Sequence, residues 1–328
     1  MNKFQIVLQR LYNTIASSMA LLRAVFGATM VGLLYCLPMS GPTAKAQEIE
    51  PRRWTHLPVG TNFVGAVYAH SEGDISLDPA LRIEAAKTKM DTWAAGYIRT
   101  FNLLGKSARF DAYQAWQEGS WNGIVDGQAR SITRKGWSDT FARFAVNFIG
   151  APPLSGKEYL EYRASRKVDT VVGAALAVQL PTGDYMNDKL INLGSNRFTF
   201  RPQVGFSHTR GPWTLEINGA SWIYTDNTSF FNGNTLEQDP LYTMQGHLIY
   251  THKPGLWVSG SLGYGMGGQT TVNGIENDDH RADIRFALSA GIPVTRKFGL
   301  KASYIGSRKQ ETVGADTDVV AVGFTMFW

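Results

Sequence analysis

The chain ends on "DVVAVGFTMFW", an apolar segment with no polar residues after Trp328. Soluble domains usually end in a few polar residues. Counting back from the end, every second residue is large and apolar: Trp328, Met326, Phe324, Val322 and Val320. The residues between them are mostly smaller or partly polar. This alternation predicts a β-strand with one uniformly apolar face, buried either in a protein core or in lipid.

The same alternation recurs about every 20 residues from Val59 onward, in segments long enough for the ~9–11 residues of a membrane-spanning strand. The clearest is "RADIRFALSAGI" (281–292), in which Ile284, Phe286 and Leu288 alternate with the charged Asp283 and Arg285. Similar segments lie at 196–206, 212–220 and 255–266. A soluble β-sandwich would show similar alternation, so the strands alone do not decide between a core and a membrane.

The connections between the expected strands favour the membrane. Read backward from the end, they alternate between short and long: 293–297, 253–255 and 207–211 are short, whereas 267–280, 225–239 and 181–195 are long. Outer-membrane barrels have short periplasmic turns and longer extracellular loops. We therefore expect an all-β protein, a transmembrane antiparallel β-barrel.

The number of strands follows from parity. Thirteen candidate strands can be drawn, but bacterial single-chain barrels have even numbers. The weakest candidate is 121–135, which has charges on both faces, and we expect it to be an outer or inward-folded loop. This leaves twelve strands, within a range of 10–14. One periplasmic connection, 151–167, is unusually long, and its "GKEYLEYRASR" could form a short amphipathic helix.

The first 46 residues are typical of a secretory signal. Arg23 precedes the apolar run "AVFGATMVGLLYCLPM", and "AKA" ends at Ala46, so cleavage is expected before Gln47. A membrane anchor is the alternative, but a 16-residue run is short against the ~20 that a spanning helix needs. A start at Met19 would give a more usual signal length. We expect a signal peptide at 1–46 and one barrel domain at 47–328.

The composition argues against a nucleic-acid-binding protein and against a protein that depends on cysteine chemistry. Charged residues make up only 18%, below the ~25% of average soluble domains, while aromatics reach 12%. Without the first 46 residues the chain has 28 basic and 27 acidic residues, and a net charge of +1 does not predict binding to nucleic acid. The only cysteine, Cys36, lies in the signal, which excludes disulfides and thiol chemistry from the mature chain.

The C-terminal strand also indicates partners. A last strand that ends on an aromatic residue resembles the signal recognised by the outer-membrane barrel-assembly machinery. Pairing of this strand with the first one would remove the open sheet edge. Trp328 would then lie at the membrane interface, where aromatic residues gather. The expected surroundings are outer-membrane lipids in a Gram-negative bacterium.

The start of the mature chain adds a family resemblance. "EPRRWTHLPVGTNFVGAVYAHSEGDI" (50–75) is similar to the opening of the outer-membrane family named for a putative MetA-pathway of phenol degradation. "GSWNGIVDG", "VNFIGAPPL" and "LPTGDYMNDKLINLGSNRFTFRP" follow in order. The resemblance implies a porin-like barrel that passes small aromatic or hydrophobic solutes. It supplies no catalytic residues.

The alternation places a set of charged residues toward the lumen, because Arg at mid-membrane on the lipid face would cost ~2–4 kcal/mol. The candidate lumen-lining residues are Arg99, Arg109, Asp111, Arg143, Arg201, Glu216, Asp283 and Arg285. As a functional set they would select or orient solutes. As a structural set they would form ion pairs across the lumen, with Asp111 and Asp283 as the available partners.

Other chemistry has weaker support. His247 is expected to face inward beside Ser259 or Ser261, the minimum for nucleophilic catalysis, but there is no G-x-S-x-G motif and no acid to orient the histidine. The acidic "ENDDHRAD" (276–283) lacks the spacing of a calcium loop. We expect no cofactor and no metal site.

We expect a passive outer-membrane channel for small, aromatic or hydrophobic molecules. A lipid-modifying outer-membrane enzyme and a plugged structural barrel are the alternatives. The apolar residues of 119–138, such as Trp121 and Trp137, predict a loop that folds into the mouth as a constriction.

Overall fold

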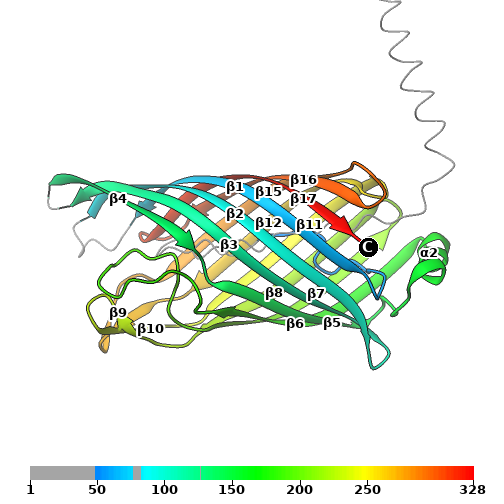
Figure 1. Ribbon diagram of the computed structural model, residues 1–328, viewed down its shortest axis with the longest axis horizontal. Helices are drawn as coiled ribbons and strands as arrows, with labels where there is room; N and C mark the ends of the chain where they lie inside the picture. Colours follow the sequence, from blue (N-terminus) through cyan, green and yellow to red (C-terminus); the bar gives the residue numbers. More distant parts are fainter. Residues whose placement is uncertain (1–48, 77–82, 126) are drawn as a thin grey trace, which may run out of the picture.

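The structure, a computed structural model, describes residues 49–76, 83–125 and 127–328. Its strands, tilted relative to the long axis, form one cylinder, with the C-terminus and helix α2 at the same end (Figure 1). The strands of the cylinder are β1 (Asn62–Ser76), β2 (Ile83–Leu103), β3 (Lys106–Val125), β5 (Thr140–Ile149), β6 (Val168–Leu180), β7 (Thr199–Arg210), β8 (Trp213–Tyr224), β11 (Leu241–Lys253), β12 (Leu256–Gly267), β15 (Arg281–Pro293), β16 (Phe298–Lys309) and β17 (Gly314–Phe327).

These twelve strands close on themselves through antiparallel pairing. β1 pairs with β2 on one side and with β17 on the other, and β3 joins β2 to β5. The ends of the chain complete the closure, because Asn62 and Trp328 exchange two backbone hydrogen bonds of 2.9 and 3.1 Å. The predicted twelve-stranded barrel is confirmed, and no edge is left between the first and last strands.

The residues of each barrel strand alternate between the two sides of the wall, as predicted. In β17, Val320 and Val322 are 56% and 50% exposed on the outer face, whereas Val319 and Ala321 are buried inside. The outer face elsewhere carries Leu, Val, Phe, Tyr and Met side chains, for example Leu262, Met244 and Val204. An outward apolar band of this kind matches the hydrocarbon layer of a membrane.

The end of the barrel with short turns is the periplasmic end by the same rule. Here the 151–167 connection forms the helix α2 (Gly156–Ser165), as predicted. The helix is not amphipathic, however, because Tyr159 is its only buried side chain. Among the described residues, no helix is long and apolar enough to cross a membrane. The expected signal peptide, 1–46, lies outside the described residues.

The extracellular end carries the longer excursions. β9 (Asn227–Phe230), β10 (Asn234–Gln238), β13 (Thr270–Val272) and β14 (Ile275–Glu276) form a small second sheet there. The predicted constriction at 119–138 is wrong. β4 (Gln128–Trp137) pairs along the outer part of β3, and its residues 128–133 are exposed, so this segment is a hairpin that extends the wall instead of crossing the mouth.

Candidate transport lumen

One side of the lumen is apolar, although the inner faces of barrels of this type are usually polar. A buried apolar group consists mainly of inward residues of β17, β1 and β2. It also includes one side chain each from β3, β5 and β6. This group, the inner cluster, consists of Leu57, Phe63, Val67, Ala69, Ile98, Tyr113, Phe141, Ala177, Val319 and Ala321. Because Phe63 is the second residue of β1 and Leu57 precedes the strand, the cluster reaches the periplasmic end.

A second apolar group lies further out along the same wall. This outer cluster consists of Ile75, Met90, Trp121 and Leu193, the last from the loop between β6 and β7. Ser71 and Thr92 lie between the two clusters, and their polar atoms are already used: the Ser71 hydroxyl donates to the Met90 carbonyl and Thr92 accepts from Gln117. The two clusters together give one wall of the lumen a mainly apolar surface.

A group of charged side chains inside the barrel is centred on Asp111, which is fully buried. Its carboxylate accepts hydrogen bonds from Arg109 at 2.5 and 2.9 Å, and from Arg143 at 3.2 Å. Arg143 also donates to Gln203 on β7 at 2.8 Å. A buried carboxylate held by two guanidiniums is a strong, geometrically fixed arrangement. The predicted residues Arg109, Asp111 and Arg143 therefore lie together inside the barrel, linking β3, β5 and β7.

The other inward candidates are spread over the remaining wall. Arg285 donates to Asp283 at 2.6 Å, two residues apart on β15. Arg201 and Glu216 are buried on β7 and β8. The structure thus places seven of the eight predicted residues inside the barrel: the Asp111 group, the Asp283–Arg285 pair, and the buried Arg201 and Glu216.

Arg99 departs from the prediction. It lies on the same face of β2 as Trp93 and Tyr97, which is the outer face. Arg99 donates to Asn62 at 2.8 Å and to the Gly60 carbonyl at 3.1 Å, at the periplasmic end of the strand. A long arginine at a strand end can extend its charge to the membrane interface, so the outward position does not bring the cost of a mid-membrane charge.

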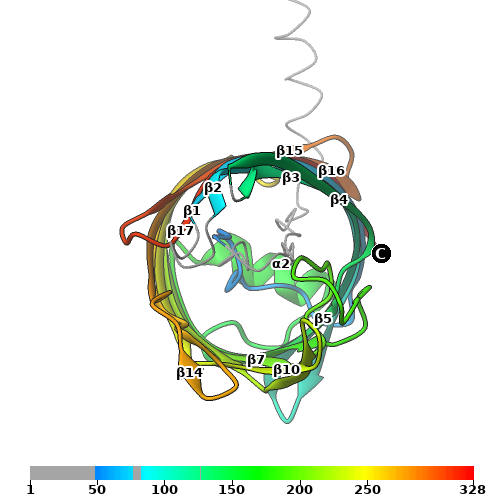
Figure 2. The same ribbon diagram turned by 90° about the vertical axis from the view of Figure 1, so that its left-hand side faces the viewer.

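The residues that precede β1 enter the lumen, which the sequence did not predict. Figure 2 shows this segment, in blue, inside the ring of strands. Its backbone amides at Arg52 and Trp54 donate to the two oxygens of Glu216 at 2.7 and 2.6 Å. This explains the buried carboxylate on β8. We call residues 49–61 the N-terminal segment.

Trp54 is the largest side chain that the N-terminal segment places against the wall. Its ring packs on Ala145 and Ala175, and the ring centre lies 5.1 Å from the guanidinium carbon of Arg143. A Cβ atom at Gly205 would approach the ring to 1.9 Å, and one at Gly173 to 2.7 Å. Glycine is therefore needed at both positions, so that two neighbouring strands can receive the indole.

At the periplasmic end the N-terminal segment meets the 151–167 connection. His56 donates from Nε2 to the Pro152 carbonyl at 2.8 Å, and Tyr159 of α2 donates to the His56 carbonyl at 2.9 Å. Burial lowers the pKa of His56 from 6.5 to about 4, so the imidazole is neutral at physiological pH. The long periplasmic connection 151–167 therefore packs against the N-terminal segment, a contact that the sequence did not predict.

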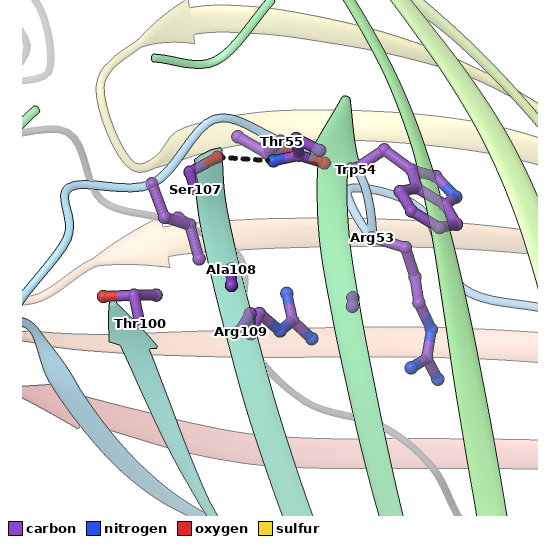
Figure 3. Close-up of a pocket in the computed structure, with 10 residues that line it drawn as sticks. Arg53, Trp54, Thr55, Thr100, Ser107, Ala108 and Arg109 are labelled. Carbon is purple, nitrogen blue, oxygen red and sulfur yellow. Dashed lines mark hydrogen bonds between the residues drawn. The ribbon is translucent and has the colours of Figure 1, made fainter. Parts of the chain in front are cut away.

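Two small cavities border the N-terminal segment. One cavity of about 20 Å³ lies between Trp54, Thr55 and the wall residues Ser107 and Arg109 (Figure 3). A second cavity, of about 10 Å³, is bounded by Arg53 and Arg201. Each has about the volume that one water molecule occupies.

His247 and Ser261 do meet inside the barrel. Nδ1 of His247 lies 2.8 Å from the Ser261 hydroxyl, and its Nε2 lies 3.2 Å from the Asn218 amide nitrogen. With Nε2 accepting from Asn218, the proton is on Nδ1, so the histidine donates to Ser261 and does not act as its base. In the predicted acidic segment, both oxygens of Asp279 accept hydrogen bonds from Thr270. No group of three potential metal ligands occurs in the described part of the chain.

Comparison with known proteins agrees with this architecture. The sequence model of the family described as "Putative MetA-pathway of phenol degradation" matches residues 68–312. A search of curated proteins found no match. An outer membrane channel from Pseudomonas putida F1 has a similar structure, with a TM-score of 0.71 and 20% identity over 86% of this chain and 100% of that one.

Two further barrels are less similar. The translocator domain of the autotransporter NalP from Neisseria meningitidis has a TM-score of 0.45 and 11% identity, covering 83% of this chain and 90% of that one. The CymD monoaromatic hydrocarbon channel has a TM-score of 0.44 and 7% identity, covering 90% and 99%.

Proposed function

This chain belongs to the family of the "Putative MetA-pathway of phenol degradation", and from that premise we propose that it is an outer-membrane channel for small hydrophobic molecules, aromatic ones among them. Passage follows the concentration gradient. The similar Pseudomonas putida structure is that of an outer membrane channel, which is in line with this proposal.

The apolar wall of the lumen carries the proposal. A channel for ions and polar solutes has polar groups around its path. Here the inner and outer clusters line one wall, from Phe63 near the periplasmic end to Ile75 and Trp121 near the outside. An apolar solute gains free energy on leaving water for such a surface, at roughly 25 cal/mol per Å². The wall therefore favours solutes that outer-leaflet lipopolysaccharide excludes.

A hydrolytic role has less support. The His247–Ser261 pair lies inside the barrel, hydrogen-bonded in the sense opposite to nucleophile activation. Both side chains are buried, and a lipid-modifying enzyme would need its reactive groups on the outer wall. We therefore propose that the protein is not an enzyme.

The test uses two adjacent residues of β17 that face opposite sides. Val319 belongs to the inner cluster, and Val320 faces lipid. Porin-deficient Gram-negative cells that produce the barrel should take up labelled naphthalene faster than cells with an empty vector. We expect Val319→Asn to reduce this uptake several-fold and Val320→Asn to leave it close to wild type. Uptake equal to that of empty-vector cells would overturn the proposal.

A plugged structural barrel is the second candidate, because the N-terminal segment lies inside the barrel and two cavities beside it are the size of a water molecule. Planar-bilayer recording of the refolded chain from Gln47 to Trp328 separates the two. Discrete open steps that an aromatic solute blocks support a channel. Folded, heat-modifiable protein that neither conducts nor raises naphthalene uptake supports the plug.

A further inference from the structure

The connections at the periplasmic end of the barrel are rich in basic residues. They comprise the turns with their flanking residues at 103–106, 210–213, 252–256 and 293–298, together with the longer connection at 150–167. These five stretches contain nine arginines and lysines but only two acidic side chains. We call the nine residues the basic rim: Lys106, Lys157, Arg163, Arg166, Lys167, Arg210, Lys253, Arg296 and Lys297.

The connections at the other end of the barrel have the opposite charge. In the sequence of 77–82, 126–139, 181–198, 225–240, 268–280 and 310–313, twelve residues are acidic and six are basic. The two ends of one nearly neutral chain therefore differ in sign. A concentration of one sign of charge on one face attracts partners of the other sign, so the periplasmic end fits an anionic partner.

Two members of the basic rim are neutralised within the chain. Arg163 lies 3.2 Å from the carboxylate of Asp169, and Lys157 lies 3.4 Å from that of Glu161. Within the part of the chain that the structure describes, no other member of the rim has an ion pair. The positive charge of the remaining seven is therefore not cancelled by a carboxylate of this chain.

The surroundings of these seven residues are neutral or open. The ammonium group of Lys106 donates to a backbone carbonyl at 2.9 Å, and the guanidinium carbon of Arg166 lies 4.7 Å from the ring centre of Tyr162. The other five are exposed: Lys167, Arg210, Lys253, Arg296 and Lys297. A negatively charged group outside the barrel can therefore reach them.

The rim also has apolar neighbours that are exposed at the same level. Leu104, two residues before Lys106, is 96% exposed at the tip of its turn. Val294 and Trp213, close in sequence to Arg296 and Arg210, are exposed as well. Basic side chains beside apolar and aromatic ones are typical of the lipid headgroup layer, where the apolar groups face the acyl chains and the long basic ones reach phosphates.

The rim surrounds most of the barrel and does not form a single patch. Its members lie in the connections β2–β3, β5–β6, β7–β8, β11–β12 and β15–β16, all at the end marked by α2 in Figure 1. On the remaining side, near the β1–β17 pair, the outward Arg99 has only neutral printed partners, Asn62 and a backbone carbonyl. Lipids contact a barrel on all sides, whereas a soluble protein docks on one face, so this distribution favours lipid.

We propose that the basic rim binds the headgroups of anionic phospholipids, of the phosphatidylglycerol type, in the inner leaflet of the outer membrane. This is a binding function in addition to the passage of solutes, and it does not depend on which solutes the lumen admits. Docking of an acidic soluble protein on the rim is the outcome that the experiment must separate from it.

The experiment is electron paramagnetic resonance of the refolded chain, from Gln47 to Trp328, in phosphatidylcholine vesicles with a trace of spin-labelled lipid. The spectrum gives the fraction of label that is slowed by contact with the barrel. Labelled phosphatidylglycerol is compared with labelled phosphatidylcholine, which has no net charge. We expect the anionic label to associate roughly threefold more strongly at low salt. This preference should shrink at 1 M salt, where charges are screened beyond about 3 Å.

Substitution locates the site, because the vesicles expose both ends of the barrel to labelled lipid. The combined rim variant should lose most of the preference: Arg210→Gln, Lys253→Gln, Arg296→Gln and Lys297→Gln. The combined control removes the same charge at the other end and should keep the preference: Arg130→Gln, Arg134→Gln, Lys135→Gln and Lys189→Gln. If the rim variant does not fold, Lys253→Glu with Arg296→Glu gives the same change in charge through two substitutions.

Equal association of the two labels with the wild-type barrel would overturn the proposal and assign the rim to a soluble acidic partner. A preference that persists in the rim variants, or that falls equally in the control, would overturn the location. Naphthalene uptake by the rim variants should remain at the wild-type rate, so failure of the channel proposal is distinguishable from failure of this one.

Discussion

The wall formed by β17, β1 and β2 and the wall formed by β7, β8 and β11 lie on opposite sides of one lumen. The first carries Val319, Val67 and Ile98 toward the interior, and the second carries Arg201 and Glu216. Both walls have the same alternation and the same apolar outer face. The difference shows that alternation determines which residues face inward, but not whether the interior is polar or apolar.

The two walls are also held in different ways. The charged side is tied together by directional contacts: Glu216 binds the N-terminal segment, and Gln203 of β7 accepts from Arg143, which joins the neighbouring Asp111 group on β3 and β5. The clusters of the apolar side are held mainly by packing, which is not directional. Loss of one group should therefore cost more on the charged side.

The largest expected effect comes from breaking the buried ion group. Asp111→Ala leaves two buried guanidiniums without their carboxylate, and removal of one partner of such a group costs about 3–5 kcal/mol of unfolding free energy. Urea unfolding of the refolded barrel measures it. Asp188→Ala, which breaks an exposed pair with Lys189, is the control and should change stability by less than about 1 kcal/mol. Similar losses in both variants would contradict the contrast between the walls.

The next effect tests whether the outer faces really are alike. Val322 lies at mid-strand on the lipid face of β17. Val322→Arg should cost about 2–4 kcal/mol, because the arginine enters the hydrocarbon layer. Unfolding in lipid vesicles measures the loss, and Val322→Leu should show almost none. An arginine tolerated at this position would mean that this face of β17 is covered by protein and not by lipid.

Much of the barrel follows from local pattern. The faces of β17 and β15 were predictable because a period of two residues needs only the sequence of one strand. Arg99 shows the limit of this reasoning. Its strand alternates as expected, but small residues on both faces, such as Ala94 and Ala95, leave the assignment of the lipid side open. The outward position of Arg99 is tolerated because its long side chain can reach the membrane interface.

The interior was less predictable than the wall. Glu216 and the glycines at 173 and 205 have a clear purpose only when the N-terminal segment lies beside them, and that contact joins residues more than 100 positions apart. No local pattern encodes it. The only signal available was indirect: a charged stretch with a tryptophan precedes the first strand, and the periplasmic connection that it meets is unusually long.

A pH-dependent effect should appear at the end where these two segments meet. Because the pKa of buried His56 is lowered to about 4, its neutral form stabilises the folded state fully above pH 6.5. Stability is lost as the pH falls from about 6.5 to about 4, by up to about 3 kcal/mol. Proteolysis within the N-terminal segment should increase over this range. His56→Gln should remove the dependence, and its persistence in that variant would assign it to another group.

The smallest expected effect concerns how closely the N-terminal segment fits the wall. Gly205→Ala places a methyl group against the Trp54 ring, and overpacking of this kind costs about 1–3 kcal/mol. Gly246→Ala on β11 meets no atom within 4 Å and should be neutral or slightly stabilising. Urea midpoints give the difference, and tryptophan fluorescence reports whether the ring has moved. If both variants unfold alike while the fluorescence of Gly205→Ala is unchanged, Trp54 is not held at this position. The contrast between a charged wall held by directional contacts and an apolar wall held by packing would then be smaller than the contacts indicate.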